Sequence, residues 1–205
     1  MRSLAVLYAL ADGRATAGSP AHPDWMESGR IYDLNGLRLF LLGRLYGQLR
    51  VDRALTTETC RIGPAGFERM AVEADARADS LAARDVSVAR GQHLLWLGRR
   101  VWQDPSFSIP EALPEPVALG ALAWLAGAGP DDADALALYA GIAAPAWAVA
   151  RRTRLNPSEV GALVVDLCAA APPASPAGTI PANSGPLAEA AARMQAHRQV
   201  SPFAS

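Results

Sequence analysis

Three aspartates close together, Asp131, Asp132 and Asp134, are the side chains of this sequence whose spacing is best suited to chemistry. Carboxylates one helical turn apart share a helix face and can hold magnesium, so a helical ligand-binding protein or a diphosphate-processing enzyme could use them with nearby arginines. Position 135, however, is alanine, and no second acidic cluster is evident. The aspartates also open a predicted helix, where carboxylates stabilise the positive end of the helix dipole. This position favours helix capping over a metal site.

The cysteines and histidines are scattered along the chain. Cys60 and Cys168 are far apart and have no second pair, which predicts reduced thiols and neither a disulfide framework nor a zinc site. His22, His93 and His197 are never four residues apart, the spacing that places two imidazoles on one helix face. No Gly-x-Ser-x-Gly elbow, Gly-x-Gly-x-x-Gly turn or Cys-His nucleophile pair occurs in a suitable context. We therefore expect no catalytic residue, no metal site and no cofactor.

The charged residues exclude several function classes. The 205 residues carry a formal net charge of −1, which gives no field to attract nucleic acid or an anionic membrane. All 19 basic residues are arginine, so the chain lacks a P-loop lysine, a Schiff-base lysine and a lysine general base. The choice of a partner must then depend on shape.

The composition and the positions of helix-capping and helix-breaking residues predict helices packed on helices. The chain is 51% hydrophobic but only 6% aromatic, with much alanine and leucine and few β-branched runs. Asp33 and Asn156 are expected to cap helix N-termini, and Pro145 is expected to kink or interrupt a helix. We predict an all-α, single-domain bundle of about eight to ten helices over residues 1–205. A flexible linker of Pro, Ala, Ser and Gly is predicted at residues 171–185, before the last helix.

Two apolar runs bear on the location of the protein. The N-terminal sequence MRSLAVLYALA fits either a short signal peptide or a first core helix, and its helical spacing favours the helix. The longest later run, residues 116–129, is too short and too rich in glycine to span a bilayer. We therefore expect a cytoplasmic protein without a membrane partner.

One predicted helix, residues 81–102, carries many arginines. Arg84, Arg90, Arg99 and Arg100 could form an anion-binding face. Solvated arginines are the more ordinary interpretation, because surface charges rarely contribute much energy.

Several longer segments and single positions together point to a family. The segments are SLAVLYALADGR, EADARADSLAARDVSVARGQHLLWLGRRVW, PVALGALAWLAGAGPDDADALALYAGIAAPAWAVARRTRLNP and PLAEAAARMQAHRQVSPFAS. The single positions are Gly91, Pro116-Val117-Ala118, Tyr139 ahead of Pro145, Arg151 ahead of Leu155-Asn156-Pro157, and Phe203-Ala204-Ser205. In this order, over almost the whole chain, the sequence resembles the urease accessory protein UreF family in its actinobacterial form.

This resemblance implies an all-α, non-enzymatic chaperone that forms a homodimer and binds UreD/UreH. That complex would recruit the nickel-carrying GTPase UreG to the apo-urease subunits, so that the urease nickel centre can be built. By position, Tyr139 and Arg151 match the family segment implicated in complex formation and GTPase coupling, and Phe203 matches the tail that packs on UreD/UreH. From the residues alone, Tyr139 could equally be a core side chain and Arg151 a partner of the helix dipole.

The chain departs from the family pattern at residues 18–27. The family usually has Gly-Gly-x-x-His-Ser-Gly-Gly-x-Glu there, whereas this chain keeps Gly18, His22 and Glu27 but has Pro23-Asp24-Trp25 in place of Ser-Gly-Gly. Glycine allows a close backbone approach that Pro-Asp-Trp does not. We interpret the stretch as a connection between the first two helices, with His22 and Glu27 as candidate partner contacts. The departure predicts an altered choice of partner or a loss of the coupling function.

Overall fold

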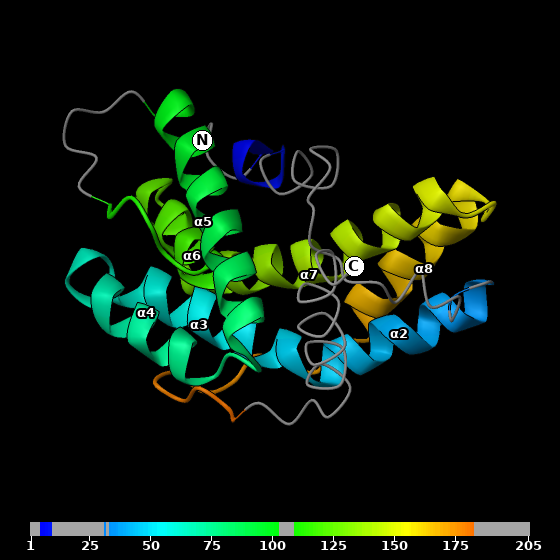
Figure 1. Ribbon diagram of the computed structural model, residues 1–205, viewed down its shortest axis with the longest axis horizontal. Coiled ribbons are helices and arrows are strands. Elements are labelled where there is room, and N and C mark those ends of the chain that lie inside the picture. The colour runs from blue at the N-terminus through cyan, green and yellow to red at the C-terminus, as the bar shows by residue number, and fades with distance from the viewer. Residues whose placement is uncertain (1–4, 10–30, 32, 103–108, 183–205) are drawn as a thin grey trace, which may run out of the picture.

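The computed structural model describes residues 5–9, 31, 33–102 and 109–182 (Figure 1). Within these residues the regular structure is helical and no β-strand occurs, which confirms the predicted all-α class. Residues 5–9 are helical. The further elements are α2 (Leu34–Tyr46), α3 (Gln48–Ile62), the 3-10 turn η1 (Pro64–Gly66), α4 (Phe67–Ala76), α5 (Leu81–Val101), α6 (Glu115–Leu125), α7 (Pro130–Arg152) and α8 (Pro157–Ala169).

Polar side chains begin several of these helices as the sequence predicts. Asp33 Oδ1 accepts a hydrogen bond from the backbone N–H of Gly36 at 2.7 Å, before α2. Asn156 Oδ1 accepts one from Ser158 at 3.0 Å, before α8. Each cap satisfies a backbone donor that has no partner within its helix, an effect of about 1 kcal/mol.

Two apolar cores lie side by side, and α7 belongs to both (Figure 1). The first core packs α3, α4, α5 and α6 around the N-terminal half of α7, and the second packs α2 and α8 against its C-terminal half. Among the most deeply buried side chains are Phe67, Leu94, Leu95, Leu122 and Leu136 in the first core and Leu37, Leu41, Leu45 and Ile142 in the second. Helix α7 therefore joins the two cores, with its buried residues up to 140 in the first and those from 142 onward in the second.

A glycine of α6 allows this helix to pack closely against α3. A Cβ placed on Gly120 would collide with the carbonyl oxygen of Thr56 and lie 2.7 Å from the Cβ of Thr59. Thr56 Oγ1 also donates a hydrogen bond to the carbonyl oxygen of Pro116 at 3.0 Å. The missing side chain therefore lets the two helix backbones approach closely enough for a buried threonine to find a partner.

The sequence predicts a kink or a break at Pro145, and no break occurs, because α7 runs continuously from residue 130 to residue 152. Proline removes one backbone hydrogen bond from a helix interior. Here the neighbours Ile142, Ala143 and Ala146 are at most 2% exposed, so packing in the second core outweighs that loss. By length and composition alone, residues 130–151 could also cross a membrane, and half of the 18-residue window that meets this test is buried inside the protein.

Residues 171–182, which we call the strap, follow α8 as a non-helical run along α3 and α4 (Figure 1). The sequence predicts a flexible linker here. In the described part of that segment, the side chains of Arg53, Glu58 and Arg77 form hydrogen bonds to strap main-chain atoms, and Ile180 packs on the first core. Side chains of distant helices thus give the strap the contacts that its own composition cannot provide.

Candidate functional site

The three aspartates at the start of α7 have different surroundings and do not form one site. Asp131 is exposed. Asp132 Oδ2 accepts a hydrogen bond from the backbone N–H of Gly129 at 3.2 Å, so this carboxylate caps the helix. Asp134 receives two hydrogen bonds from Arg53 of α3, at 2.8 Å from Nε and 2.5 Å from Nη2. The capping interpretation is supported, and no group of three metal-binding side chains occurs among the described residues.

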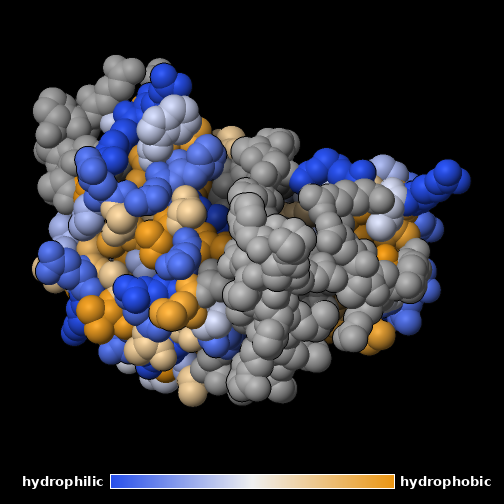
Figure 2. Space-filling model, viewed as in Figure 1, coloured by the Kyte–Doolittle hydropathy of each residue, from blue (hydrophilic) through white to orange (hydrophobic). Residues whose placement is uncertain are grey.

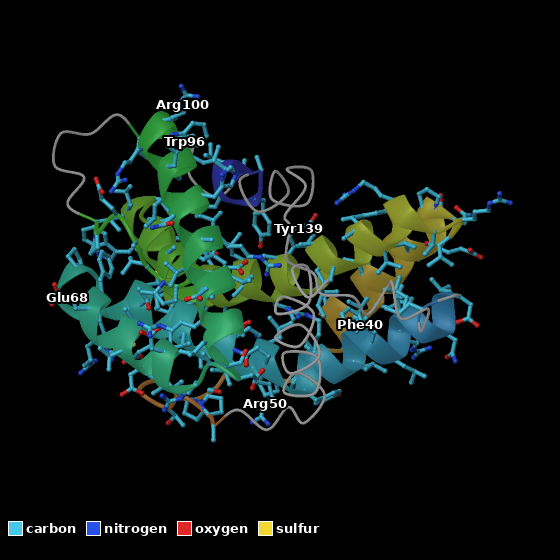
Figure 3. All side chains as sticks on the ribbon, in the orientation of Figure 1. Phe40, Arg50, Glu68, Trp96, Arg100 and Tyr139 are labelled. Atoms are coloured by element: carbon cyan, nitrogen blue, oxygen red, sulfur yellow. The ribbon has the colours of Figure 1, made fainter. Side chains whose placement is uncertain are left out.

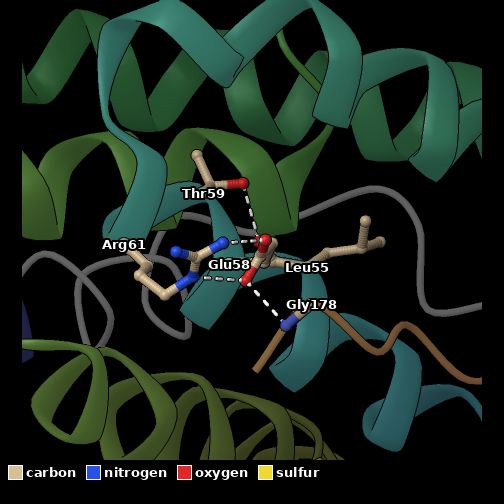
Figure 4. A network of polar contacts seen from close by, with 5 residues as sticks. All are labelled: Leu55, Glu58, Thr59, Arg61 and Gly178. Atoms are coloured by element: carbon tan, nitrogen blue, oxygen red, sulfur yellow. Dashed lines mark hydrogen bonds and ion pairs between the residues drawn. The ribbon is translucent and has the colours of Figure 1, made fainter. Parts of the chain in front are cut away.

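Buried polar residues gather on α3, which the sequence does not single out. Arg53, Thr56, Glu58 and Thr59 are all at most 6% exposed. Arg61 donates to both oxygens of Glu58, at 2.8 and 2.6 Å, and this hydrogen bonding is the main reason why the pKa of Glu58 lies below its ordinary value (Figure 4). Each of the four has an intramolecular partner, as buried polar groups require. This cluster ties helices together.

The arginines of α5 are also engaged within the protein. Arg84 pairs with Asp75 at 2.7 Å, Arg90 pairs with Glu115 at 3.3 Å, Arg99 donates to the carbonyl oxygen of Ile109 at 3.2 Å, and Arg100 lies over the ring of Trp96 at 4.6 Å. They do not converge on one anion-binding face. Neither are they simply solvated, because each has a defined neighbour. The arginines and aspartates together therefore do not build the diphosphate site that the sequence leaves open.

A charged cluster brings together Arg44 of α2, Gln48 and Asp52 of α3, Arg90 of α5 and its partner Glu115 of α6. Burial, with a smaller contribution from the neighbouring Arg44, lowers the pKa of Arg90 to about 10, and the carboxylate of Asp52 opposes this shift. Gln48 Nε2 donates to Asp52 Oδ1 at 2.8 Å. Residues from four elements are brought together here, so no local spacing in the sequence could have shown the cluster.

An aromatic cluster is exposed at the end of α5. His93 stacks on Trp96 with ring centroids 5.9 Å apart, and Arg100 covers the same ring, which is part of a side chain 49% exposed (Figure 3). On the face drawn in Figure 2, apolar and polar residues are interspersed over the α3–α6 half of the molecule. Further exposed apolar side chains are Leu39, Tyr46, Val72, Leu81, Val101, Trp124 and Val165.

Both cysteines are free, as the sequence predicts. Cys60 is buried, and its Sγ donates a weak hydrogen bond to the carbonyl oxygen of Ala128 at 3.4 Å. Burial, with Asp132 as a smaller cause, raises the pKa of Cys60 to about 11. Cys168 is only partly buried, and burial also raises the pKa of its thiol. Both environments suppress the reactive thiolate.

The structure places Tyr139 and Arg151 on the same helix but does not bring them together. Tyr139 lies at the middle of α7, where its ring meets that of Tyr8 edge to face at a centroid distance of 5.4 Å (Figure 3). Arg151 is exposed near the C-terminal end of α7. Twelve residues of α-helix separate them by about 18 Å along the axis and turn them by about 120°. Any partner contacts they make are therefore two separate contacts.

The remaining predicted contacts, His22, Glu27 and Phe203, lie outside the described residues, and so does Pro23-Asp24-Trp25. The candidate positions that the structure can place are therefore the aspartates, the two cysteines, His93, the arginines of α5 and the pair on α7. Arg53 and Glu58 are functional candidates that sequence reasoning missed. No local signal distinguishes them, because α3 contains many polar residues and the long-range partners of these two lie 81 and 120 residues away along the chain.

A comparison with protein-family models matches residues 31–168 to the family described as UreF, which spans helices α2 to α8 almost completely. The chain is 31% identical to the urease accessory protein UreF of Mycobacterium marinum over the full length of both chains. It is 32% identical to that of Mycobacterium sp. strain JLS, again over both full lengths. It is 32% identical to that of Mycobacterium tuberculosis H37Rv over 82% of this chain and 81% of the relative. No solved structure matches the chain significantly.

Proposed function

The chain belongs to the UreF family of urease accessory proteins, and from this premise we propose that it is a non-enzymatic chaperone of urease maturation. It binds UreD/UreH, and the complex recruits the GTPase UreG to the apo-urease subunits. Nickel is the cargo of this assembly and not a resident cofactor of the chain. The observation that carries the proposal is the family match over residues 31–168, which include almost all of helices α2 to α8.

The chemistry of the chain supports a role that depends on contact and position. Because the sequence contains no lysine, it cannot supply a P-loop lysine, so the GTPase of the assembly must be a partner. The side chains that could have formed a diphosphate site do not meet one another. Asp132 caps α7 and Asp134 binds Arg53. The arginines of α5 have other neighbours on α4, α5, α6 and the residues before α6. We therefore propose that the chain acts through helix faces that bind its partner proteins.

Tyr139 and Arg151 are proposed to contact partners at two places on α7. Arg151 is exposed near the C-terminal end of the helix, where a cation also interacts favourably with the helix dipole. Tyr139 is partly buried at the edge of the second core, so its role includes holding the contact with Tyr8. His22, Glu27 and Phe203 complete the proposed set of partner contacts.

The working form is proposed to be a cytoplasmic homodimer that uses neither nucleic acid nor a membrane. Exposed apolar residues on the outer face of α2, Leu39 at 62% and Tyr46 at 57%, support an association through helix faces. The net charge of −1 is consistent with protein partners and offers no attraction to nucleic acid. Light scattering after size-exclusion chromatography measures the oligomeric state directly, and a monomer at all concentrations would contradict this part of the proposal.

The test is co-purification of the tagged chain with co-expressed UreD/UreH and then with UreG. We expect both to be retained, and we expect deletion of residues 198–205 to weaken retention of UreD/UreH. Arg151→Ala should weaken retention of UreG, whereas Arg50→Ala, at another exposed arginine, is the matched control and should not. Failure of the unchanged chain to retain UreD/UreH would overturn the proposal.

A further inference from the structure

The strap has three side-chain anchors, which follow one another in the same order along the strap and along the helices. Arg53 Nη1 donates to the carbonyl oxygen of residue 172 at 2.9 Å. Glu58 Oε2 accepts a hydrogen bond from the N–H of Gly178 at 3.2 Å (Figure 4). Arg77 Nε then donates to the carbonyl oxygen of residue 181 at 3.2 Å. The strap therefore follows the direction of α3 and ends beside the C-terminus of α4.

Each anchor is a charged group that the folded helices already hold in place. Asp134 of α7 fixes Arg53, and the hydrogen bonds from Arg61 fix Glu58. Glu73, one turn earlier on α4, pairs with Arg77. Hydrogen bonds to ionised groups are about twice as strong as neutral ones, and these anchors need little further ordering to receive the strap.

The strap itself is built to be held through its main chain. Its sequence, APPASPAGTIPA, has no charged side chain and four prolines, which restrict its backbone before it binds. Gly178 adopts a φ of +77°, a conformation that favours glycine, and its N–H is the group that meets Glu58. No atom lies within 4 Å of a Cβ built on Gly178. A substitution there would act through backbone conformation and not through a collision.

We propose that Arg53, Glu58 and Arg77 are positioning residues that fix where the C-terminal residues leave the folded helices. This inference rests on the proposed function, in which the C-terminal segment with Phe203 binds UreD/UreH. Because the strap joins α8 to residue 183, its anchors set the starting point of that segment beside α4. A released strap would leave the segment tethered only at α8, and the binding of UreD/UreH would then include the cost of ordering it.

Two variants release the strap in different ways, and a third variant serves as the control. Glu58→Gln removes the charge that accepts the Gly178 N–H, and Gly178→Ala disfavours the backbone conformation at the same contact. Glu68→Gln on α4 changes an exposed carboxylate that has no hydrogen bond to the strap (Figure 3). The urea midpoint of each full-length variant tests whether the helices remain folded. Gly178→Ala keeps the test valid if Glu58→Gln proves unstable.

The first measurement is hydrogen exchange by mass spectrometry over peptides that cover residues 171–182. Loss of one charge-assisted hydrogen bond predicts that strap exchange rises about tenfold in both release variants and stays unchanged in the control. The second measurement is the dissociation constant for purified UreD/UreH. We expect it to rise about fivefold to tenfold in the release variants and to be unchanged in Glu68→Gln.

A double-variant cycle with the chain lacking residues 198–205 separates positioning from general damage. If the strap acts through the C-terminal segment, the release variants should weaken binding in the full chain and have no added effect in the shortened chain. Faster strap exchange with unchanged binding would overturn the inference, and so would unchanged exchange. Failure of the unchanged chain to bind UreD/UreH would overturn the proposed function as well. Normal binding by every release variant would overturn the strap's role alone.

Discussion

Removal of the Asp134 carboxylate should destabilise the protein strongly, although its neighbour Asp131 should be dispensable. Asp134 is the counter-charge of Arg53, whose side chain is only 6% exposed, and the two form paired hydrogen bonds at 2.8 and 2.5 Å. Breaking a buried ion pair by removing one partner costs about 3–5 kcal/mol, because the other charge remains buried without compensation. Asp134 itself is 16% exposed, so water offsets part of that cost. We expect Asp134→Ala to lower the free energy of unfolding by about 2–4 kcal/mol.

Asp131→Ala is the matched control, since it makes the same substitution at another aspartate, three residues earlier in the same helix. Asp131 is exposed, and substitutions at such positions usually change the free energy of unfolding by less than about 0.5 kcal/mol. A third variant, Arg53→Met with Asp134→Leu, removes both charges and replaces them with apolar volume. It should recover much of the stability lost in Asp134→Ala, because no unpaired charge remains.

Urea unfolding followed by circular dichroism measures all three variants. With a slope of about 2 kcal/mol per molar urea, the midpoint of Asp134→Ala should fall by about 1–2 M. Equal effects of Asp131→Ala and Asp134→Ala, or a change below about 0.5 kcal/mol at Asp134, would refute the assignment of this carboxylate to Arg53. A metal-binding role for the cluster would instead make the stability of the unchanged chain depend on magnesium.

The other predictions concern packing, thiol reactivity and pH. Gly120→Ala should lower the free energy of unfolding in urea by about 2–3 kcal/mol, because the added Cβ would collide with the backbone of α3. The control is Gly43→Ala, where no atom lies within 4 Å of the added Cβ, so this variant should be as stable as the unchanged chain or more stable. Equal effects of the two variants would contradict the close crossing of α3 and α6. Burial raises the pKa of Cys60 to about 11, so only about a thousandth of this thiol is ionised at pH 8. Iodoacetamide should therefore modify Cys60 only after the protein unfolds, which peptide mass spectrometry measures. Rapid labelling of the native protein would contradict the burial of Cys60. The pKa of Glu58 lies below its ordinary 4.5, so its carboxylate stabilises the fold above pH 4.5 and loses this effect as the pH falls. The stability gap between the unchanged chain and Glu58→Gln should therefore shrink between pH 7 and pH 3.5, and a gap that widens would contradict the sign.

Local signals in the sequence predicted the helices well. Asp33 and Asn156 mark helix starts because their side chains bind backbone donors two or three residues away, so both partners of the interaction lie within one short window. The all-α class followed from a composition rich in good helix formers. The helix does not break at Pro145, because burial in the second core, supplied by α2 and α8, outweighs one lost backbone hydrogen bond.

The contacts that join distant parts of the chain could not be predicted in this way. Arg53 and Asp134 are separated by 81 residues, and Glu58 and Gly178 by 120, so no periodicity connects them. The strap looks like a linker in the sequence because its own side chains provide little binding energy. Of the candidate partner contacts, helix periodicity places Tyr139 and Arg151 on different sides of one helix, but their value as contacts comes from the family resemblance alone.

The central claim is tested most directly by the nickel content and the activity of urease that is produced together with its accessory proteins. Cells that carry the urease structural genes with UreD/UreH and UreG would be compared with and without the gene for this chain. The account predicts nickel-loaded, active urease only when the chain is present, and predicts a partial loss with the chain that lacks residues 198–205. Equal nickel loading and activity in its absence would contradict the account.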